Sequence, residues 1–235
     1  VNGYTLIYLY SQKRRNEVLR SFLYFGGWIE LWLLIHFIAI SLVVDKEILT
    51  SLFKVIFSVF IFNGVFFLNF IYALINRKKD FFYFILIIIS ALFAIITIFT
   101  DYIICGYVNV YKGFFGIAHE RGKFYPFALF ALFWFPHFYS IYLVYRKIKK
   151  KDFERLKKPF TLVVLLIGLD LLIVTISDFI FTHVLNIDIP RLYGLITVTT
   201  LISIFILVIE KKYKFLFISI DDVSHDLFDV HEGIL

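Results

Sequence analysis

Ionisable side chains inside long apolar runs are the residues of this sequence best placed to do chemistry. Four of them are Glu30, His36, His137 and Asp170. Burying such a group within an apolar helix is costly, so it suggests a binding site, a proton-sensing group or a hydrogen bond that holds helices together. The structural role is the commoner one for each residue taken singly. Glu30 and His36 lie six residues apart, about 120° around a helix, and are not expected to face each other.

A second polar set is expected at one level, near the outer ends of the predicted helices. Asp178 and His183 fall toward the end of one helix, and Asp101 and His119 fall in or beside a long connection. These four residues could line a polar pocket open to the exterior, or a weak cation site, although their spacing matches no particular metal. We name Asp101, His119, Asp178 and His183 as candidate ligand-binding residues, with hydrogen bonding between helices as the alternative.

Motifs of known catalytic chemistry are missing from the sequence. It contains no H-E-x-x-H, no G-x-S-x-G and no Walker loop, and its six histidines do not cluster at ligand spacings. The single cysteine, Cys105, excludes an intrachain disulfide and a thiolate metal cluster. We therefore predict no catalytic residue, no metal and no cofactor in this chain.

The composition places the chain in a membrane. It is 61% hydrophobic and 21% aromatic with a mean hydropathy of +0.87, whereas a soluble domain is about 45–50% apolar. The net charge of +6 could suggest a nucleic-acid partner, but the basic residues sit at the ends of apolar runs. The expected partner is the lipid bilayer and not nucleic acid.

Six apolar runs are each long enough to cross about 30 Å of hydrocarbon as a helix. An opening run, residues 1–10, is too short, and we expect it to be the remnant of a longer first helix. The sequence thus predicts an all-α integral membrane protein, a seven-transmembrane helix bundle over residues 1–214 whose first helix is truncated. The glycine-rich connection 101–123 is expected to be the largest non-helical element. The six full runs are residues 21–44, 51–75, 81–100, 124–145, 159–183 and 192–209.

Lysine and arginine predict the orientation. Loops 11–20, 76–80, 146–158 and 210–214 hold 18 of the 24 basic residues, and the opposite side holds the other six. Because basic residues accumulate in cytoplasmic loops, the N-terminus is predicted outside and the C-terminus in the cytoplasm. Anionic lipid headgroups are the expected contact of loop 146–158.

The tail, residues 215–235, differs from the rest. It is acidic, and apolar residues recur at Ile220, Val223, Leu227 and Val230, which is typical of an amphipathic helix. We predict a cytoplasmic linker helix that leads to an output domain absent from this sequence.

Short segments follow one another in a recognisable order along nearly the whole chain. They are Lys13-Arg14-Arg15-Asn16, the stretch around Trp28 and Trp32, residues 67–70 before Arg77-Lys78-Lys79, Thr100-Asp101-Tyr102-Ile103-Ile104-Cys105-Gly106, residues 168–178, residues 187–190 and Gly194. In this order and spacing the chain resembles the N-terminal seven-transmembrane sensor region of bacterial sensor histidine kinases and related membrane signalling proteins. Residues 227–235 look like the beginning of a PAS sensor domain.

The resemblance implies a receptor in a two-component system, located in the bacterial inner membrane as a multi-pass protein. Its implied partners are an unknown external or membrane-dissolved small ligand and a second copy of the chain in a homodimer. A kinase activity would belong to the absent output domain. A small-molecule or ion transporter or channel is the alternative function, for which broken helices, internal repeats and midplane charges are expected.

Overall fold

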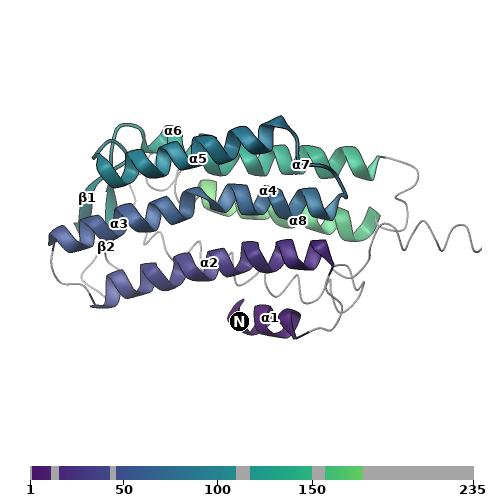
Figure 1. The fold of residues 1–235 in the computed structure, drawn as a ribbon, viewed down its shortest axis with the longest axis horizontal. Coiled ribbons are helices and arrows are strands. Elements are labelled where there is room, and N and C mark those ends of the chain that lie inside the picture. The colour runs from purple at the N-terminus through teal and green to yellow at the C-terminus, as the bar shows by residue number, and fades with distance from the viewer. Residues whose placement is uncertain (1, 12–15, 43–45, 110–116, 150–156, 177–235) are drawn as a thin grey trace, which may run out of the picture.

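The computed structural model describes residues 2–11, 16–42, 46–109, 117–149 and 157–176, which form a helical bundle with a small sheet at one end (Figure 1). Its elements, in chain order, are α1 (Asn2–Tyr10), α2 (Glu17–Leu42), α3 (Lys46–Ile61), α4 (Asn63–Leu74), α5 (Phe81–Phe99), β1 (Ile104–Asn109), β2 (Ile117–Arg121), α6 (Tyr125–Leu129), the π-helical turn η1 (Phe130–Trp134), α7 (Phe135–Ile148) and α8 (Lys157–Val174).

Within the described residues, four helical stretches are long and apolar enough to cross a membrane: Glu17–Ala39, Glu47–Leu74, Phe81–Phe99 and Tyr125–Ile148. Four of the predicted helices are confirmed in position by these stretches: 21–44 as far as residue 42, 51–75 as the pair α3–α4, 81–100 and 124–145. The helix predicted over 159–183 corresponds in its first part to α8. The run 192–209 and the tail 215–235 lie outside the described residues, so the total of seven spans stays a prediction.

The outward face of α5 is apolar along its whole length. Its side chains at spacings of three and four residues are between half and four-fifths exposed, and the most exposed are Phe81 at 75% and Phe99 at 79%. Soluble monomeric proteins rarely expose a continuous apolar face of this size to water. The surface is compatible with a membrane location. The stripe consists of Phe81, Phe84, Ile88, Leu92, Ile95 and Phe99.

The pair α3–α4 forms the centre of the bundle. It packs against α2, α5 and α7, and it is the most buried of the four long apolar stretches. Aromatic rings fill its interface with α2. Such rings bury large apolar areas and prefer edge-to-face or offset contacts, so they stabilise this interface. The ring pairs follow an antiparallel order, with centroids 4.8–5.8 Å apart: Phe22–Phe70, Phe25–Phe67, Trp28–Phe66, Trp32–Phe60 and His36–Phe53.

The span predicted to be continuous over 51–75 is interrupted at Phe62. The amide of Phe62 donates to the Val59 carbonyl at 3.2 Å, an i→i+3 bond that closes α3 before α4 begins. The indole Nε1 of Trp28 donates to the same carbonyl at 2.8 Å. This side chain from α2 thus satisfies a backbone group at the break, where helical bonding is incomplete.

A second irregularity lies in the last long stretch, where η1 separates α6 from α7. The amide of Phe135 donates to the carbonyl of Phe130, five residues back. Pro136 follows and has no amide hydrogen to give to Leu132, its regular α-helical acceptor. The Leu132 carbonyl lies against Gly64 so closely that a Cβ there would be 2.3 Å from it. Only glycine allows α4 and η1 to approach in this way.

The described parts of the connection 101–123, residues 101–109 and 117–123, are non-helical, as predicted, but they contain an antiparallel strand pair that the all-α prediction omits. β1 pairs with β2 from Ile104↔Arg121 to Asn109↔Ile117, with a bulge between Ile104 and Gly106. β1 packs against α3, and Ile104 is fully buried. The glycine-rich composition hides the strand pattern in the sequence.

Candidate functional site

The α4–α5 turn is shaped by the way α4 ends. Asn76 has a positive φ of 47°, which asparagine tolerates better than most residues. Its amide donates to Ala73 at 3.1 Å, and the amide of Arg77 donates to Tyr72 at 2.9 Å. These two bonds form a Schellman motif, which closes the helix and fixes the backbone of Arg77.

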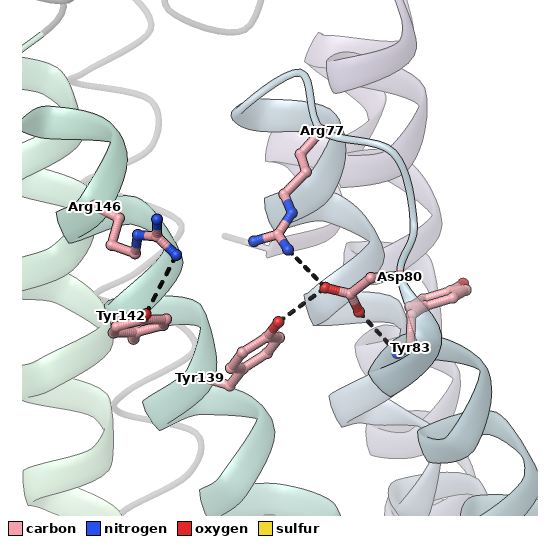
Figure 2. A network of polar contacts seen from close by, with 6 residues as sticks. All are labelled: Arg77, Asp80, Tyr83, Tyr139, Tyr142 and Arg146. Atoms are coloured by element: carbon pink, nitrogen blue, oxygen red, sulfur yellow. Dashed lines mark hydrogen bonds and ion pairs between the residues drawn. The ribbon is translucent and has the colours of Figure 1, made fainter. Parts of the chain in front are cut away.

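Asp80 begins the next helix as its N-cap. Its Oδ1 accepts from the backbone amide of Tyr83 at 3.4 Å, and its Oδ2 accepts from Arg77 Nη2 and from the Tyr139 hydroxyl, each at 2.9 Å (Figure 2). Tyr139 belongs to α7, 59 residues further along the chain. We call Arg77, Asp80, Tyr83 and Tyr139 the Asp80 network, which joins the α4–α5 turn to α7.

The surroundings of Asp80 favour its charged form. Partial burial opposes ionisation, but the neighbouring hydroxyls of Tyr72 and Tyr139, the Tyr83 amide and the Arg77 guanidinium together hold the pKa of Asp80 below its usual range. The Tyr72 hydroxyl is buried close by without a well-formed hydrogen bond. At neutral pH Asp80 is therefore a negatively charged acceptor for Arg77 and Tyr139, and not a proton donor.

The same face of α7 continues toward the end of the helix. Tyr139, Tyr142 and Arg146 follow one another at i, i+3 and i+7, which places them on one side. Arg146 Nη1 lies 3.4 Å from the Tyr142 hydroxyl, and its guanidinium sits 5.7 Å from the centre of the same ring. The guanidinium groups of Arg77 and Arg146 point toward each other across the space between the two elements (Figure 2).

The predicted outer pocket is only partly within the described residues. Asp101 is exposed, and its Oδ1 lies 2.7 Å from Lys54 Nζ of α3. His119 lies on β2, paired in register with Tyr107. Asp178 and His183 are outside the described residues, so the pocket itself stays a prediction.

Buried rings surround the two histidines predicted inside the spans. His137 is sandwiched between Phe67 of α4 and Phe133 of η1, at 4.4 and 4.3 Å between ring centroids, and its Nδ1 lies 2.6 Å from the Phe133 carbonyl. Because a carbonyl only accepts, Nδ1 carries the proton. This bond and the stacking fit the structural reading for His137.

His36 and the predicted acids do not gather into one site. His36 is buried between Trp32 and Phe53, and its Nδ1 has no hydrogen-bond partner. Glu30 is half-buried, and its Oε1 also lacks a partner. Asp170 lies on α8, and its side chain is outside the described residues. Within the described ranges, no three histidine, cysteine or acidic residues are grouped to hold a metal ion.

The sequence alone did not predict the Asp80 network as a site, and Arg77 and Asp80 entered the prediction only as part of the basic loop 76–80 between two spans. One signal was present, because an aspartate directly before a long apolar run is a typical N-cap. Tyr139 gave no signal, since nothing in its spacing indicates a contact 59 residues away.

No protein-family model, curated protein or solved structure matches this chain. Its function therefore has to be argued from its own residues.

Proposed function

We propose that this chain is the signal-reception domain of a bacterial membrane sensor, which relays helix movement to a cytoplasmic output domain such as a histidine kinase. One observation carries the proposal: polar contacts tie α3–α4 to neighbouring elements at both of its ends. Lys54 pairs with Asp101 at one end, and Arg77 with Asp80 at the other. About 23 residues separate Lys54 from Arg77, or roughly 35 Å of helix.

The first tie reaches the part of the protein most accessible to an external ligand. Asp101 directly precedes the strand pair, and β1 packs against α3. A ligand that binds one position of the strand pair better than another would shift the population of α3 positions by that difference in affinity. The predicted pocket of Asp101, His119, Asp178 and His183 belongs to this region.

The second tie reaches α7 through Tyr139, and α7 leads into the basic loop 146–158. A shift of α3–α4 along its axis would move Asp80 relative to Tyr139. In the proposed orientation, with the N-terminus outside and the C-terminus in the cytoplasm, this movement occurs at the cytoplasmic surface. The positive-inside distribution of lysine and arginine supports that orientation.

Pulsed electron paramagnetic resonance tests whether the two ends are coupled. Spin labels at Lys79→Cys and Lys149→Cys, in a Cys105→Ser background, report the distance between the α4–α5 turn and the end of α7. Lys54→Gln breaks the distant ion pair, and we expect it to shift that distance by about 1–2 Å, the scale of signalling helix movements. Lys123→Gln is the matched control, an exposed lysine at the same end as Lys54. Identical distributions for Lys54→Gln and the parent chain would contradict the proposal.

A transporter or channel is the second candidate, and the interruption at Phe62 favours it. Broken helices line substrate sites in many transporters, and Asn63 beside the break has a buried Oδ1 without a hydrogen-bond partner. Reconstituted vesicles containing a pH-sensitive or a potassium-sensitive dye separate the two functions. Ion flux that Asn63→Leu abolishes would support a transport function. No ion flux, together with a distance shift in the Lys54→Gln variant, would support signal reception.

A further inference from the structure

Cations dominate the end of the bundle that holds the α4–α5 turn. Residues 76–80 and 146–149 contain six lysines and arginines but one acid, Asp80. Five cations at this end lie over tyrosine rings, so that each side chain runs along apolar surface and carries its charge to the end of the helix. The pairs are Arg20–Tyr24, Arg77–Tyr72, Lys79–Tyr83, Arg146–Tyr142 and Lys149–Tyr145.

Two of these cations converge from different elements. Arg77 extends from the α4–α5 turn and Arg146 from α7, with their guanidinium groups directed toward each other (Figure 2). Tyr139 bonds Asp80, and Arg146 lies two turns further on the same face of α7, about 10 Å along the helix. The Asp80 network thus joins the α4–α5 turn to α7, and the two arginines extend from these two elements toward the same space (Figure 2).

Within the part of the chain that the structure describes, no acidic side chain besides Asp80 pairs with the two arginines, since Asp80 pairs with Arg77 and the Arg146 contact is to a hydroxyl. Asp80 accepts one hydrogen bond from Arg77 Nη2, which leaves the rest of that five-donor group for another acceptor. Among the described residues, the hydrogen bond that Arg146 makes is to the neutral Tyr142 hydroxyl. Two guanidinium groups face each other, and the one carboxylate drawn beside them, that of Asp80, lies on the far side of Arg77 from Arg146 (Figure 2). Such a pair attracts an additional anion, and phosphate matches the fork of arginine best.

Exposed aromatic side chains lie on α5 and α7 around Tyr139, further from this end of the bundle than the two arginines. Phe82, Phe135 and Phe138 are 50, 43 and 55% exposed, and the rings of Phe82 and Phe135 both contact Tyr139. An acyl chain covers such a surface, whereas a free phosphate ion does not. We propose that Arg77 and Arg146 together bind the phosphate of one anionic phospholipid, whose acyl chains lie on this aromatic surface. The inference depends on a membrane location, and it is independent of the signalling role.

Native mass spectrometry of the full chain in detergent micelles tests the site, with phosphatidylglycerol as the probe. The parent chain is expected to retain one lipid molecule more tightly than the rest. Arg146→Gln should weaken that binding by about tenfold, the loss of one charge-assisted contact. Arg77→Gln combined with Arg146→Gln should abolish it. Arg146→Gln leaves Asp80 and its partners in place, so its effect does not depend on a folding defect.

Lys149→Gln is the matched control. It removes the same charge from the same end of α7, but its side chain lies over the ring of Tyr145 and not over that of Tyr142, and we expect retention to be unchanged. An equal loss for Lys149→Gln and Arg146→Gln would mean general attraction only and would overturn the proposal. Equal retention by Arg146→Gln and the parent chain would also overturn it. Displacement of the lipid by an equal concentration of inorganic phosphate would reject the lipid as the occupant.

Discussion

At Asp80 a single side chain makes three different stabilising interactions. It caps α5, pairs with Arg77 and accepts the hydroxyl of Tyr139. A cap contributes about 1 kcal/mol and an exposed ion pair less. Their combination makes Asp80 more important than its position in a turn suggests, because the same carboxylate also fixes the distance between the turn and α7.

The charge of Asp80 predicts a pH dependence of stability. Since the folded protein holds its pKa below the ordinary value of about 4, the ionised carboxylate stabilises the fold at neutral pH, and this contribution is lost as the pH falls through the folded-state pKa. Asp80→Asn keeps a good N-cap but removes the charge, so it should cost about 0.5–1.5 kcal/mol at neutral pH. Unfolding in micelles should show this difference narrowing below about pH 4.

Asp101→Asn provides the comparison for that measurement. Asp101 is 74% exposed, so its pair with Lys54 is more strongly screened and should contribute less. A stability difference between Asp80→Asn and the parent chain that grows in acid would contradict the assignment.

Two tryptophans on one face of α2 allow a matched test of the break at Phe62. Trp28 donates to Val59, whereas the Nε1 of Trp32 is buried without a hydrogen-bond partner. Trp28→Phe should therefore destabilise the protein by about 1 kcal/mol more than Trp32→Phe, since only the first removes a hydrogen bond. Thermal unfolding of both variants checks this, and equal losses would show that the indole bond contributes nothing.

At the scale of the elements, the contact between α4 and η1 depends on Gly64. A Cβ at this position would meet the Leu132 carbonyl at 2.3 Å and the Pro136 ring at 2.9 Å. Gly64→Ala should destabilise the protein by about 1–3 kcal/mol, the typical cost of overpacking. Gly27→Ala is the control, because nothing lies within 4 Å of a Cβ there, and alanine suits a helix better than glycine. A smaller loss for Gly64→Ala than for Gly27→Ala in thermal unfolding would refute the close contact.

The positions of four long helices could be predicted because each apolar run must satisfy its own backbone, and its length measures the span. The break at Phe62 and the turn η1 could not be predicted from the sequence, because they depend on contacts with residues of other elements. Trp28 completes the bonding at one, and Gly64 makes room at the other. The candidate site was likewise predictable only in part. The sequence indicates Asp80 as a helix cap, but Tyr139 comes close to it only through the packing of α7.

For the molecule as a whole, Cys105 offers a test of orientation. It is the single cysteine, it is exposed, and it lies in β1, next to the end of α3–α4 that carries Lys54. In the proposed orientation a membrane-impermeant maleimide should label it in intact cells. Lys149→Cys in a Cys105→Ser background should be labelled only after permeabilisation. The reverse pattern would overturn the orientation and the direction of signalling with it.

The turn η1 also sets the rotational phase of the second half of its span. One α-helical residue turns the chain by about 100° and advances it by 1.5 Å. Deleting one residue from Phe130–Trp134 would let this turn close into regular helix and would swing Tyr139 more than a quarter turn away from Asp80, while Phe127 kept its contact with Phe93. One surplus residue thus aligns the two halves of a single helix with two different partners.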